Sequence, residues 1–324
     1  MHDSFIQYLC DPLTKEPLDV EIIHENDGFI FEGYLYSATN RFPIVRGIPR
    51  FSGYQENNSY AHSFGYQWNK WAKVQFESHN VGKPMEGWTL RMWEKITTVT
   101  AKDMRNALVV DFGCGSGRFI EIARMKNARV IGIDLSASVE SAYESFKNDR
   151  NVLIVQGDML NPPIKCEAAD GAFSIGVLHH TPDPRRGVEK MAKSVKKGGW
   201  VAISVYSKGG YYDFPTVKFY RKLFKLLERF FRYLPPLIYS LVTVYVISFS
   251  LKVPLMGRII RSLFPYIKLP DKKWSLLDTF DSVTPSYQSA HEPYEVFTWF
   301  KDLGLIEIEP SDWGFTSYHA VKPK

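Results

Sequence analysis

The chain is poor in cysteine and begins without a recognisable export signal. Its 324 residues include three cysteines, too few and too widely spaced for a disulfide framework: Cys10, Cys114 and Cys166. No CxxC pair occurs, which excludes a zinc ribbon or a thioredoxin-like redox site. The opening sequence MHDSFIQYLCDP lacks the basic and apolar segments of a signal peptide. We therefore expect a cytoplasmic protein without a metal site.

Acidic residues are scarce in one segment. Between Lys208 and Lys273, thirteen Lys and Arg residues stand against three acids, a net charge of +10, whereas the whole chain carries +5. A local concentration of positive charge indicates what kind of partner the segment can bind, and it does not indicate the fold. The 45% apolar and 15% aromatic content, by contrast, excludes a disordered chain and predicts a sizeable core.

Residues 1–52 are expected to form a small β-rich unit. The pieces VEIIH, GFIFE, YLYS and RFPIVRGIPRF have the composition of short strands separated by Gly, Asn and Pro turns. The opening YLCDPLTKEPL and the ending RFPIVRGIPRF resemble the zinc-ribbon-derived domain of methyltransferase activators. Cys10 has no cysteine partner, so this unit departs from that family by lacking metal ligands. We interpret it as a structural appendage packed on the main domain.

Residues 53–106 are predicted to be an aromatic, helical lead-in. The sequences SFGYQWNKWAKVQF and GWTLRMWEKITTV place four tryptophans in or near helices: Trp68, Trp71, Trp88 and Trp93. Two interpretations remain open for them. Helices ahead of a nucleotide-binding domain can close over its ligand, or the tryptophans simply pack on the sheet.

From residue 107 the pattern becomes regular. The apolar runs NALVV, ARVIGID, NVLIVQGD, DGAFSIGV and WVAISVY alternate with helical sequences, which predicts a parallel sheet covered on both faces. After an interruption the pattern resumes with EVFTWFKDLG, LIEIEP and GFTSYHAVK. We therefore predict one α/β domain made of residues 107–207 and 291–324, with residues 208–290 inserted before its last helix.

A glycine-rich turn, DFGCGSGRF, follows the first of these strands. The dinucleotide fingerprint requires a glycine at the sixth position from Gly113, but this position is Arg118. The pattern present, Asp111-x-Gly113-x-Gly115-x-Gly117, resembles the first motif of class I S-adenosylmethionine-dependent methyltransferases. Its glycines let the backbone approach a ligand, while turn amides and the helix N-terminus supply donors.

This resemblance implies a Rossmann-like sheet with an antiparallel last strand, and S-adenosyl-L-methionine as the cofactor. Asp134 ends the second strand, where the family's acid receives both ribose hydroxyls. Asp158 ends the third strand, where an acid receives the adenine amino group, with Met159 beside the ring. The expected cofactor-binding residues are Asp111, Gly113, Cys114, Gly115, Gly117, Asp134, Leu135, Asp158, Met159 and Gly176. Cys114 is expected to be a small packing residue rather than a nucleophile.

The fourth strand ends in SIGVLHHTPDP, and ligands of open α/β sheets bind at the carboxyl ends of strands. This sequence resembles small-molecule methyltransferases in which the second histidine lies close to the reaction. His180 is therefore the candidate catalytic residue. It could remove a proton from the acceptor, orient the acceptor, or only stabilise the loop. His179 is expected to point inward or to contact the substrate.

The insertion begins with a basic, amphipathic sequence. Its apolar residues recur at helical spacing: Phe219, Leu223, Leu226, Leu227 and Phe230. Basic residues occupy much of the rest of the predicted helix: Lys218, Lys222, Lys225, Arg229 and Arg232. An uncharged run, 233–251, is barely long enough to span a bilayer. Two interpretations remain open. The insertion is a lid whose apolar face covers the substrate, or residues 215–260 dock on the inner face of a membrane and admit a lipid-type substrate.

The acceptor itself is not evident from the sequence. The segment LLDTFDSVTPSYQSAHEP returns the chain to the α/β domain, and with His179 it supplies our substrate-binding candidates: Asp278, Asp281, Tyr287, Gln288 and His291. We expect methyl transfer to a small molecule, glycan or lipid. The alternatives are an RNA methyltransferase, which the absence of an RNA-binding motif disfavours, and a non-catalytic S-adenosylmethionine-binding module. The sequence leaves the oligomeric state open.

Overall fold

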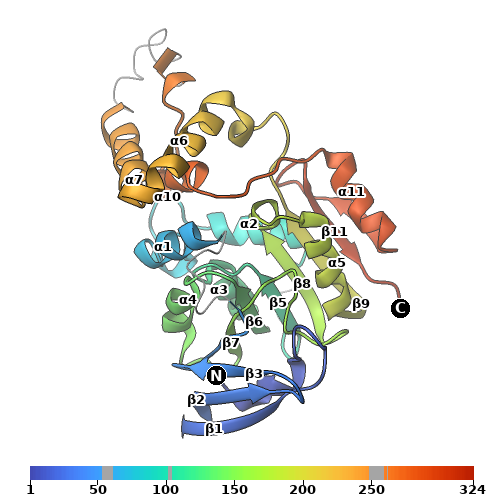
Figure 1. Ribbon diagram of the computed structural model, residues 1–324. Helices are drawn as coiled ribbons and strands as arrows, with labels where there is room; N and C mark the ends of the chain where they lie inside the picture. Colours follow the sequence, from blue (N-terminus) through green and yellow to red (C-terminus); the bar gives the residue numbers. More distant parts are fainter. Residues whose placement is uncertain (53–60, 101–103, 248–258, 261) are drawn as a thin grey trace.

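A computed structural model describes residues 1–52, 61–100, 104–247, 259–260 and 262–324 (Figure 1). A small sheet lies at one end of the molecule, the insertion lies at the other end, and a large sheet lies between them. The expected boundary between residues 52 and 53 falls at the edge of the undescribed residues 53–60.

The large sheet has seven strands in the order β10-β11-β9-β8-β5-β6-β7. The strands are β5 (Leu108–Phe112), β6 (Arg129–Asp134), β7 (Val152–Gln156), β8 (Ala169–Ile175), β9 (Val195–Ser204), β10 (Ile306–Pro310) and β11 (Ser317–Val321). Strands β5 to β9 pair in parallel, and β11 lies antiparallel between β9 and β10. The predicted Rossmann-like sheet with an antiparallel last strand is confirmed.

The register of the parallel strands brings their carboxyl ends to one edge. Phe112 of β5 lies opposite Ile133 of β6, and Asp134 lies opposite Gln156 of β7. On the other side of β5, Asp111 lies opposite Phe173 of β8. The loops that follow these strands therefore begin side by side.

Helices cover both faces of the large sheet (Figure 1). The helices around it are α1 (His62–Lys70), η2 (Glu77–His79), α2 (Trp88–Thr97), α3 (Arg118–Met125), α4 (Val139–Phe146), η3 (Leu178–His180), α5 (Pro184–Ser194) and α11 (Pro293–Asp302). Side chains of α2, α3 and α4 form one core cluster with the sheet, and those of α5 and α11 belong to another. Trp93 of α2 is fully buried, with its ring edge-on to Phe173 and Trp200, so this tryptophan packs on the sheet.

The N-terminal unit is a four-stranded antiparallel sheet preceded by a short helix. Its elements are η1 (Asp3–Tyr8), β1 (Asp19–Asn26), β2 (Phe29–Tyr36), β3 (Arg41–Val45) and β4 (Ile48–Pro49). The expectation that GFIFE and YLYS form separate strands is wrong, since both belong to β2. Gly33 does not mark a turn there. A Cβ atom at Gly33 would lie 2.3 Å from the carbonyl oxygen of Glu21, so glycine permits close pairing with β1.

Backbone and side-chain bonds attach this unit to the large sheet. The amide of Phe51 donates to the carbonyl of Gln156 at the end of β7, and the amide of Cys10 donates to the carbonyl of Pro163. Burial raises the pKa of the Cys10 thiol to about 11. The buried Arg50 donates to the side chains of Gln156 at 2.8 Å and Glu140 at 2.7 Å. Within the described ranges, no cluster of three or more His, Cys, Asp and Glu side chains could hold a metal ion.

The pairing of Arg50 leads to a prediction about stability. Arg50→Ala removes a buried guanidinium, the donor to Oε1 of Gln156 and one of the two cationic partners of Glu140, so we expect the free energy of unfolding to fall by about 2–4 kcal/mol. Arg46→Ala is a matched control, because Arg46 pairs with the same Glu140 at 3.2 Å but has a 73% exposed side chain. The control should change stability by less than about 1 kcal/mol. Urea denaturation measures both, and equal losses would contradict a special role for Arg50.

The insertion is helical where the structure describes it. Its helices are η4 (Tyr211–Asp213), α6 (Pro215–Phe231), α7 (Leu234–Leu241), the π-helical η5 (Val242–Ile247) and α10 (Lys272–Val283). Helices α6, α7 and α10 contact one another. The uncharged run expected at 233–251 continues into residues 248–251, which lie outside the described residues. In the described part of the chain, every helix is too short or too polar to cross a membrane.

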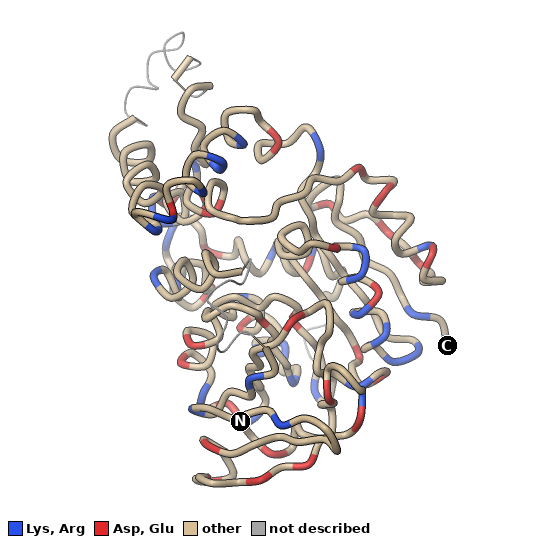
Figure 2. Tube along the Cα trace, in the orientation of Figure 1, with Lys and Arg blue, Asp and Glu red and all other residues tan. Residues whose placement is uncertain are grey.

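Helix α6 presents its expected apolar face outward. Phe219, Leu226 and Phe230 are 59%, 69% and 72% exposed, whereas Val217 and Phe224 are the buried residues of this helix. This face of α6 is therefore exposed, and the choice between a lid and a membrane contact stays a prediction. Apolar residues lie on more than one side of α6, and the side that contains Phe224 and Tyr220 packs on Tyr239 of α7. Figure 2 shows that basic residues accompany these helices.

Candidate active site

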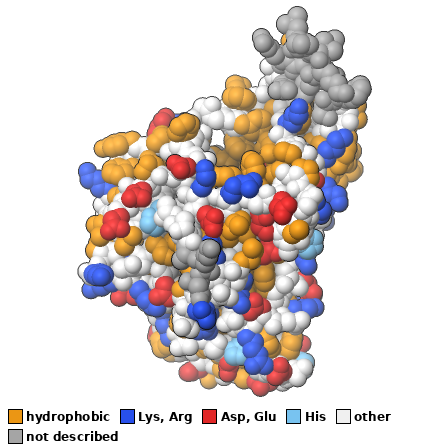
Figure 3. All heavy atoms as spheres, turned by 180° about the vertical axis from the view of Figure 1, so that it is seen from behind, with side chains coloured by type: hydrophobic (Ala, Val, Ile, Leu, Met, Phe, Trp, Pro, Cys, Tyr) orange, Lys and Arg blue, Asp and Glu red, His pale blue; other side chains and the backbone are white. Residues whose placement is uncertain are grey.

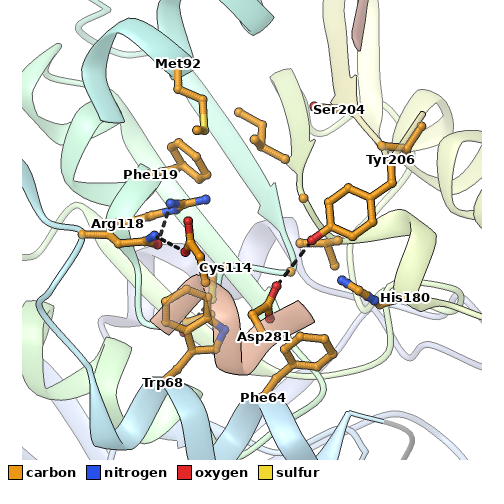
Figure 4. Close-up of a pocket in the computed structure, with 18 of the residues that line it drawn as sticks. Phe64, Trp68, Met92, Cys114, Arg118, Phe119, His180, Ser204, Tyr206 and Asp281 are labelled. Carbon is orange, nitrogen blue, oxygen red and sulfur yellow. Dashed lines mark hydrogen bonds between the residues drawn. The ribbon is translucent and has the colours of Figure 1, made fainter. Parts of the chain in front are cut away.

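A cavity of about 480 Å³ lies at the carboxyl ends of β5, β6, β8 and β9 (Figure 4). Its floor includes the glycine turn after β5. Its remaining walls come from distant segments: α1 contributes Phe64 and Trp68, η4 contributes Tyr211, and α10 contributes Trp274 and Leu277. Trp68 and Trp88 line this cavity, so two of the lead-in tryptophans lie at the site while Trp93 packs on the sheet.

The glycine turn adopts backbone conformations that favour glycine. Gly113 and Gly115 have φ angles of +86° and +54°. A Cβ atom at Gly113 would lie 2.3 Å from a methyl carbon of Val177, and one at Gly115 would lie 3.1 Å from Nε1 of Trp68. The turn is therefore pressed between the loop after β8 and helix α1. A side chain at Gly113 would collide with Val177, and one at Gly115 would crowd the ring of Trp68.

Asp134 connects the glycine turn to the end of β6. Its Oδ2 accepts the amide of Gly115 at 2.9 Å, and its Oδ1 accepts the amide and hydroxyl of Ser136 at 2.8 and 2.7 Å. An ionised carboxylate has about four acceptor positions, so about one remains for a ligand hydroxyl while these bonds persist. Asp134 and Leu135 both line the cavity, as expected.

Asp111 lies buried behind the turn. Burial raises the pKa of its carboxyl group well above the usual value, and the negative charge of Asp134 raises it further. Its Oδ2 has no hydrogen-bond partner among the described residues. Burial also raises the pKa of the Cys114 thiol, which keeps this group protonated and makes it a poor nucleophile. A cationic ligand close to this turn would stabilise the two carboxylates.

The remaining cofactor candidates divide into two groups. Met159 and Gly176 line the cavity beside Cys114. Gly117 and Asp158 are not part of the lining, and Oδ1 of Asp158 accepts the amide of Leu160 at 2.8 Å. Burial raises the pKa of Asp158. Its contact with an adenine amino group stays a prediction.

His180 is held in one orientation at the cavity wall. Its Nδ1 lies 2.9 Å from the carbonyl oxygen of Tyr287, and because a carbonyl can only accept, Nδ1 carries the proton. The other ring nitrogen, Nε2, is then an acceptor, and within the described part of the chain it has no partner. Burial lowers the pKa of His180, so the ring is neutral near pH 7. His180 is therefore a neutral ring at the cavity wall, with an acceptor nitrogen that has no hydrogen-bond partner among the described residues.

His179 lies behind the cavity, in a stack of aromatic rings. Its ring centroid is 3.5 Å from that of Tyr206, and the ring of Tyr206 stacks on Tyr212 at 3.7 Å. Burial lowers the pKa of His179 well below the usual value. This histidine therefore points inward and supports Tyr206, which does line the cavity.

Two carboxyl groups of α10 enter the cavity from the side opposite the glycine turn. The hydroxyl of Tyr206 donates to Oδ2 of Asp281 at 3.4 Å. Arg118 donates to Oε1 of Gln75 at 2.5 Å, and Nε2 of Gln75 donates to Oδ1 of Asp278 at 3.1 Å (Figure 4). Burial, followed by the charge of Asp281, raises the pKa of Asp278 to about 7. These residues form the polar side of the cavity.

The other acceptor candidates lie outside the cavity lining. Tyr287 contributes its backbone carbonyl to His180, and its side chain is 49% exposed. Gln288 donates to the carbonyl of Tyr212 at 3.5 Å. His291 bonds to Ser289 and Glu295. The segment after α10 therefore supports the wall of the cavity, while Asp278 and Asp281 form part of that wall.

Sequence reasoning missed several lining residues. From the sequence, Arg118 was identified only as the residue that breaks a dinucleotide motif and was not predicted to line the cavity. No motif pointed to the other lining residues, which are Gln75, Tyr206, Tyr211 and Tyr212. A signal existed for Tyr206, which lies two residues beyond the end of β9, at the same sheet edge as the glycine turn. The other residues come from segments whose positions no local pattern reveals.

Comparisons with known proteins agree with this geometry. Residues 110–203 match the family model described as a methyltransferase domain. This segment contains a class I S-adenosylmethionine-dependent methyltransferase domain. The methyltransferase match includes the glycine turn, Asp134, Asp158 and His180.

The relatives of this methyltransferase domain include enzymes of two kinds. The tRNA (carboxymethyluridine(34)-5-O)-methyltransferase of Arabidopsis thaliana is 28% identical over 36% of this chain and 28% of its own length. The ubiquinone biosynthesis O-methyltransferase of Chromobacterium violaceum is 31% identical over 31% of this chain and 44% of its own length. A solved geranyl diphosphate C-methyltransferase from Streptomyces coelicolor is 19% identical, with a TM-score of 0.32, over 36% of this chain and 43% of that one. Each match spans less than half of the relative's length.

Class I methyltransferase domains use S-adenosyl-L-methionine as the methyl donor, and the residues of this cavity fit that molecule. Its sulfonium and ammonium groups are cations, which suits the carboxylate of Asp134 in the lining and that of Asp111, buried behind the glycine turn. Its ribose hydroxyls could donate to the remaining acceptor position of Asp134, which lines the cavity together with Gly113 and Gly115. The aromatic rings of Trp68 and Phe119, which also line the cavity, can attract a cation.

The raised pKa of Asp278 leads to a prediction about pH. An aspartate in the unfolded chain titrates near pH 4, so between roughly pH 4 and 7 the folded state binds more protons than the unfolded state. The free energy of unfolding should therefore fall as the pH rises through this window, by up to about 1.4 kcal/mol per pH unit from this group. Asp278→Asn has no titratable group at this position, so it should remove this pH-dependent fall in the free energy of unfolding.

Urea denaturation at several pH values tests this expectation. Relative to the wild type, Asp278→Asn should become progressively more stable from roughly pH 4 to 7, and the difference should stay constant above this window. Asp302→Asn, at an exposed position on α11, is the control and should show no such trend. A stability difference for Asp278→Asn that does not depend on pH would contradict the assignment.

Proposed function

We propose that this chain transfers the methyl group of S-adenosyl-L-methionine to a small-molecule, glycan or lipid-type acceptor. The observation that carries the proposal is the orientation of His180. The carbonyl of Tyr287 holds its proton on Nδ1, the buried Nε2 has no hydrogen-bond partner among the described residues, and His180 lines a cavity that also contains the glycine turn. Methyl transfer to a hydroxyl or amine is helped by a base that lies at the same cavity as the methyl donor.

In the proposed reaction, the cofactor supplies a methyl group bound to a positively charged sulfur. His180 accepts the acceptor's proton at Nε2 while the acceptor's oxygen or nitrogen forms a bond to the methyl carbon. The carbon–sulfur bond breaks, its electron pair stays on sulfur, and the products are the methylated acceptor, S-adenosylhomocysteine and a protonated histidine. Aligning the acceptor with the methyl group contributes much of the rate, and the aromatic walls of Phe64, Trp274 and Tyr206 provide the alignment.

The polar side of the cavity indicates which acceptors would bind. Asp278 and Asp281 accept hydrogen bonds, so acceptors with hydroxyl or amine groups fit this side, whereas phosphates next to these carboxylates would be repelled. Arg118 compensates part of this negative charge. The pocket therefore favours a neutral or cationic acceptor group.

A second candidate function is methylation of RNA, which the tRNA-modifying relative from Arabidopsis thaliana favours. Retention of tRNA that weakens as salt increases, together with methyl transfer to that tRNA, would establish it. The carboxylates within the cavity and the location of the basic residues on α6, away from the cavity lining, favour the first proposal.

The cofactor assignment leads to a prediction about binding. S-adenosylmethionine and S-adenosylhomocysteine should each raise the thermal unfolding midpoint of the wild type, because both bind only the folded state. Asp134→Ala removes the ribose acceptor and a bond to the glycine turn, so the stabilisation should be lost. Asp302→Ala, at an exposed carboxylate outside the cavity, should retain it. Absence of any stabilisation of the wild type would contradict the proposal.

The role of His180 leads to a separate prediction. His180→Gln should lower the rate of methyl transfer by about 10²- to 10⁴-fold, while stabilisation by S-adenosylmethionine is retained. The rate of the wild type should rise with pH and level off below pH 6.5, since burial lowers the pKa of the base. Transfer of radiolabelled methyl from the donor to fractionated cell extracts, followed by mass spectrometry, provides the assay and identifies the acceptor.

His291→Gln is the matched control for His180→Gln. His291 is also buried and hydrogen-bonded but lies outside the cavity lining, so this variant should transfer methyl groups at close to the wild-type rate. Equal losses in both variants would mean that His180 acts only through the local structure. Binding of the cofactor by the wild type without transfer to any fraction would indicate a non-catalytic binding module.

A further inference from the structure

The insertion exposes an unusual amount of apolar side-chain surface. Of the 24 large hydrophobic residues that are exposed in the described part of the chain, 14 lie between Phe214 and Phe264. In α6 they include Phe219, Leu226 and Phe230. In α7 and η5 they recur every three or four residues, as Leu234, Ile238, Leu241, Val242, Tyr245 and Val246. Apolar side chains gathered in this way usually mark an interaction surface.

A groove runs between α6 and α7 and is continuous with this surface. Its volume is about 530 Å³, and its walls are almost entirely carbon. Residues of both helices line it, among them Leu227 and Phe231 of α6 and Leu234, Ile238 and Val242. No residue of this groove belongs to the lining of the candidate active site.

Basic residues lie directly beside the exposed apolar residues of α6. At about 100° per residue, Phe219, Leu226 and Phe230 fall within an arc of about 40°. Four cations occupy the adjoining arc of about 60°: Lys218, Lys222, Lys225 and Arg229. Lys218 pairs with Asp213, but in the described ranges no carboxylate forms an ion pair with Lys222, Lys225 or Arg229. Figure 3 shows hydrophobic and basic side chains next to one another over the insertion.

The chemistry of this surface restricts its partner. A helix with an exposed apolar stripe beside unpaired cations matches the boundary of a bilayer, where acyl chains lie beneath phosphate groups. Glu228 is the one acidic residue of α6, so an anionic partner meets little repulsion there. Since no described helix can cross a bilayer, the contact would be one in which α6 lies along the surface.

We propose that the exposed face of α6, α7 and η5 docks on the surface of a membrane that contains anionic phospholipids. Phe219, Leu226 and Phe230 enter the acyl region, and Lys222, Lys225 and Arg229 contact lipid phosphates. The groove between α6 and α7 receives the end of an acyl chain. This proposal does not depend on the methyl-transfer reaction, because none of these side chains lines the candidate active site.

Flotation of the full chain with lipid vesicles tests the proposal. Vesicles of phosphatidylcholine and phosphatidylglycerol in equal amounts should carry the wild type to the top of a density gradient, whereas phosphatidylcholine alone should carry much less. Binding should weaken as salt increases, because the Debye length shortens from about 10 Å at 0.1 M to about 3 Å at 1 M. A wild type that stays at the bottom with anionic vesicles would overturn the proposal.

Paired variants separate the apolar and the basic contributions. Phe230→Ser should lower the partition coefficient about tenfold, and Lys222→Gln and Lys225→Gln about fivefold each. The matched controls are Tyr294→Ser, since Tyr294 is also 72% exposed but lies on α11, and Lys197→Gln, at an exposed lysine of β9 outside the insertion. The controls should bind vesicles like the wild type.

Two further measurements keep the result unambiguous. Every variant should retain its thermal stabilisation by S-adenosylmethionine, which shows that the fold and the donor site are intact. Light scattering should show whether the chain self-associates without lipid. If Phe230→Ser dissolves a dimer without changing flotation, the surface is an interface between copies of this chain and the membrane proposal is wrong. If tRNA displaces the wild type from vesicles while Phe230→Ser floats normally, the surface is a nucleic-acid contact instead.

Discussion

The hydrogen bond from the amide of Gly115 to Asp134 is the contact on which the rest of the site depends. It connects the turn after β5 to the end of β6. The register of the two strands brings the amide of Gly115 and the carboxylate of Asp134 to the same edge of the sheet. Because the turn is held there, Asp111 stays buried behind it and Trp68 packs over it. The loop after β8 then closes the same edge, since Val177 occupies the space that a side chain at Gly113 would need. The side of the cavity at which we propose that the methyl donor binds is thus one strand–turn–helix unit held in place by Trp68, Asp134 and Val177.

The acceptor side is built differently. Its residues come from α1, Gln75 and α2 before the sheet, from η4 and from α10. Interactions between distant segments position them, such as the contact of Gln75 with both Arg118 and Asp278. The orientation of His180 depends on a carbonyl 107 residues later in the chain. The insertion therefore has two roles: η4 and α10 complete the cavity, while α6 and α7 present their apolar residues to the outside.

The strands and the donor site were accessible to sequence reasoning because both follow from local rules. Buried parallel strands produce unbroken apolar runs such as NALVV, and positive φ angles in a turn produce the spacing of Gly113 and Gly115. The same reasoning was wrong about β2, because Gly33 permits close pairing instead of a turn. It left open which side of α6 faces outward, because a helix with apolar residues on several sides does not reveal by spacing which side is buried.

The sequence by itself determined the α/β domain, its S-adenosylmethionine motif and the histidine after the fourth strand, since each depends on residues close together in the chain. Only the tertiary structure decided that Asp278 and Asp281 enter the cavity while Tyr287, Gln288 and His291 do not, and that Nε2 of His180 is the free nitrogen. It also decided which side of α6 faces outward. The physical reason is the same in each case. A side chain's burial and its partners depend on what packs against it, and here the packing elements are far apart in the sequence.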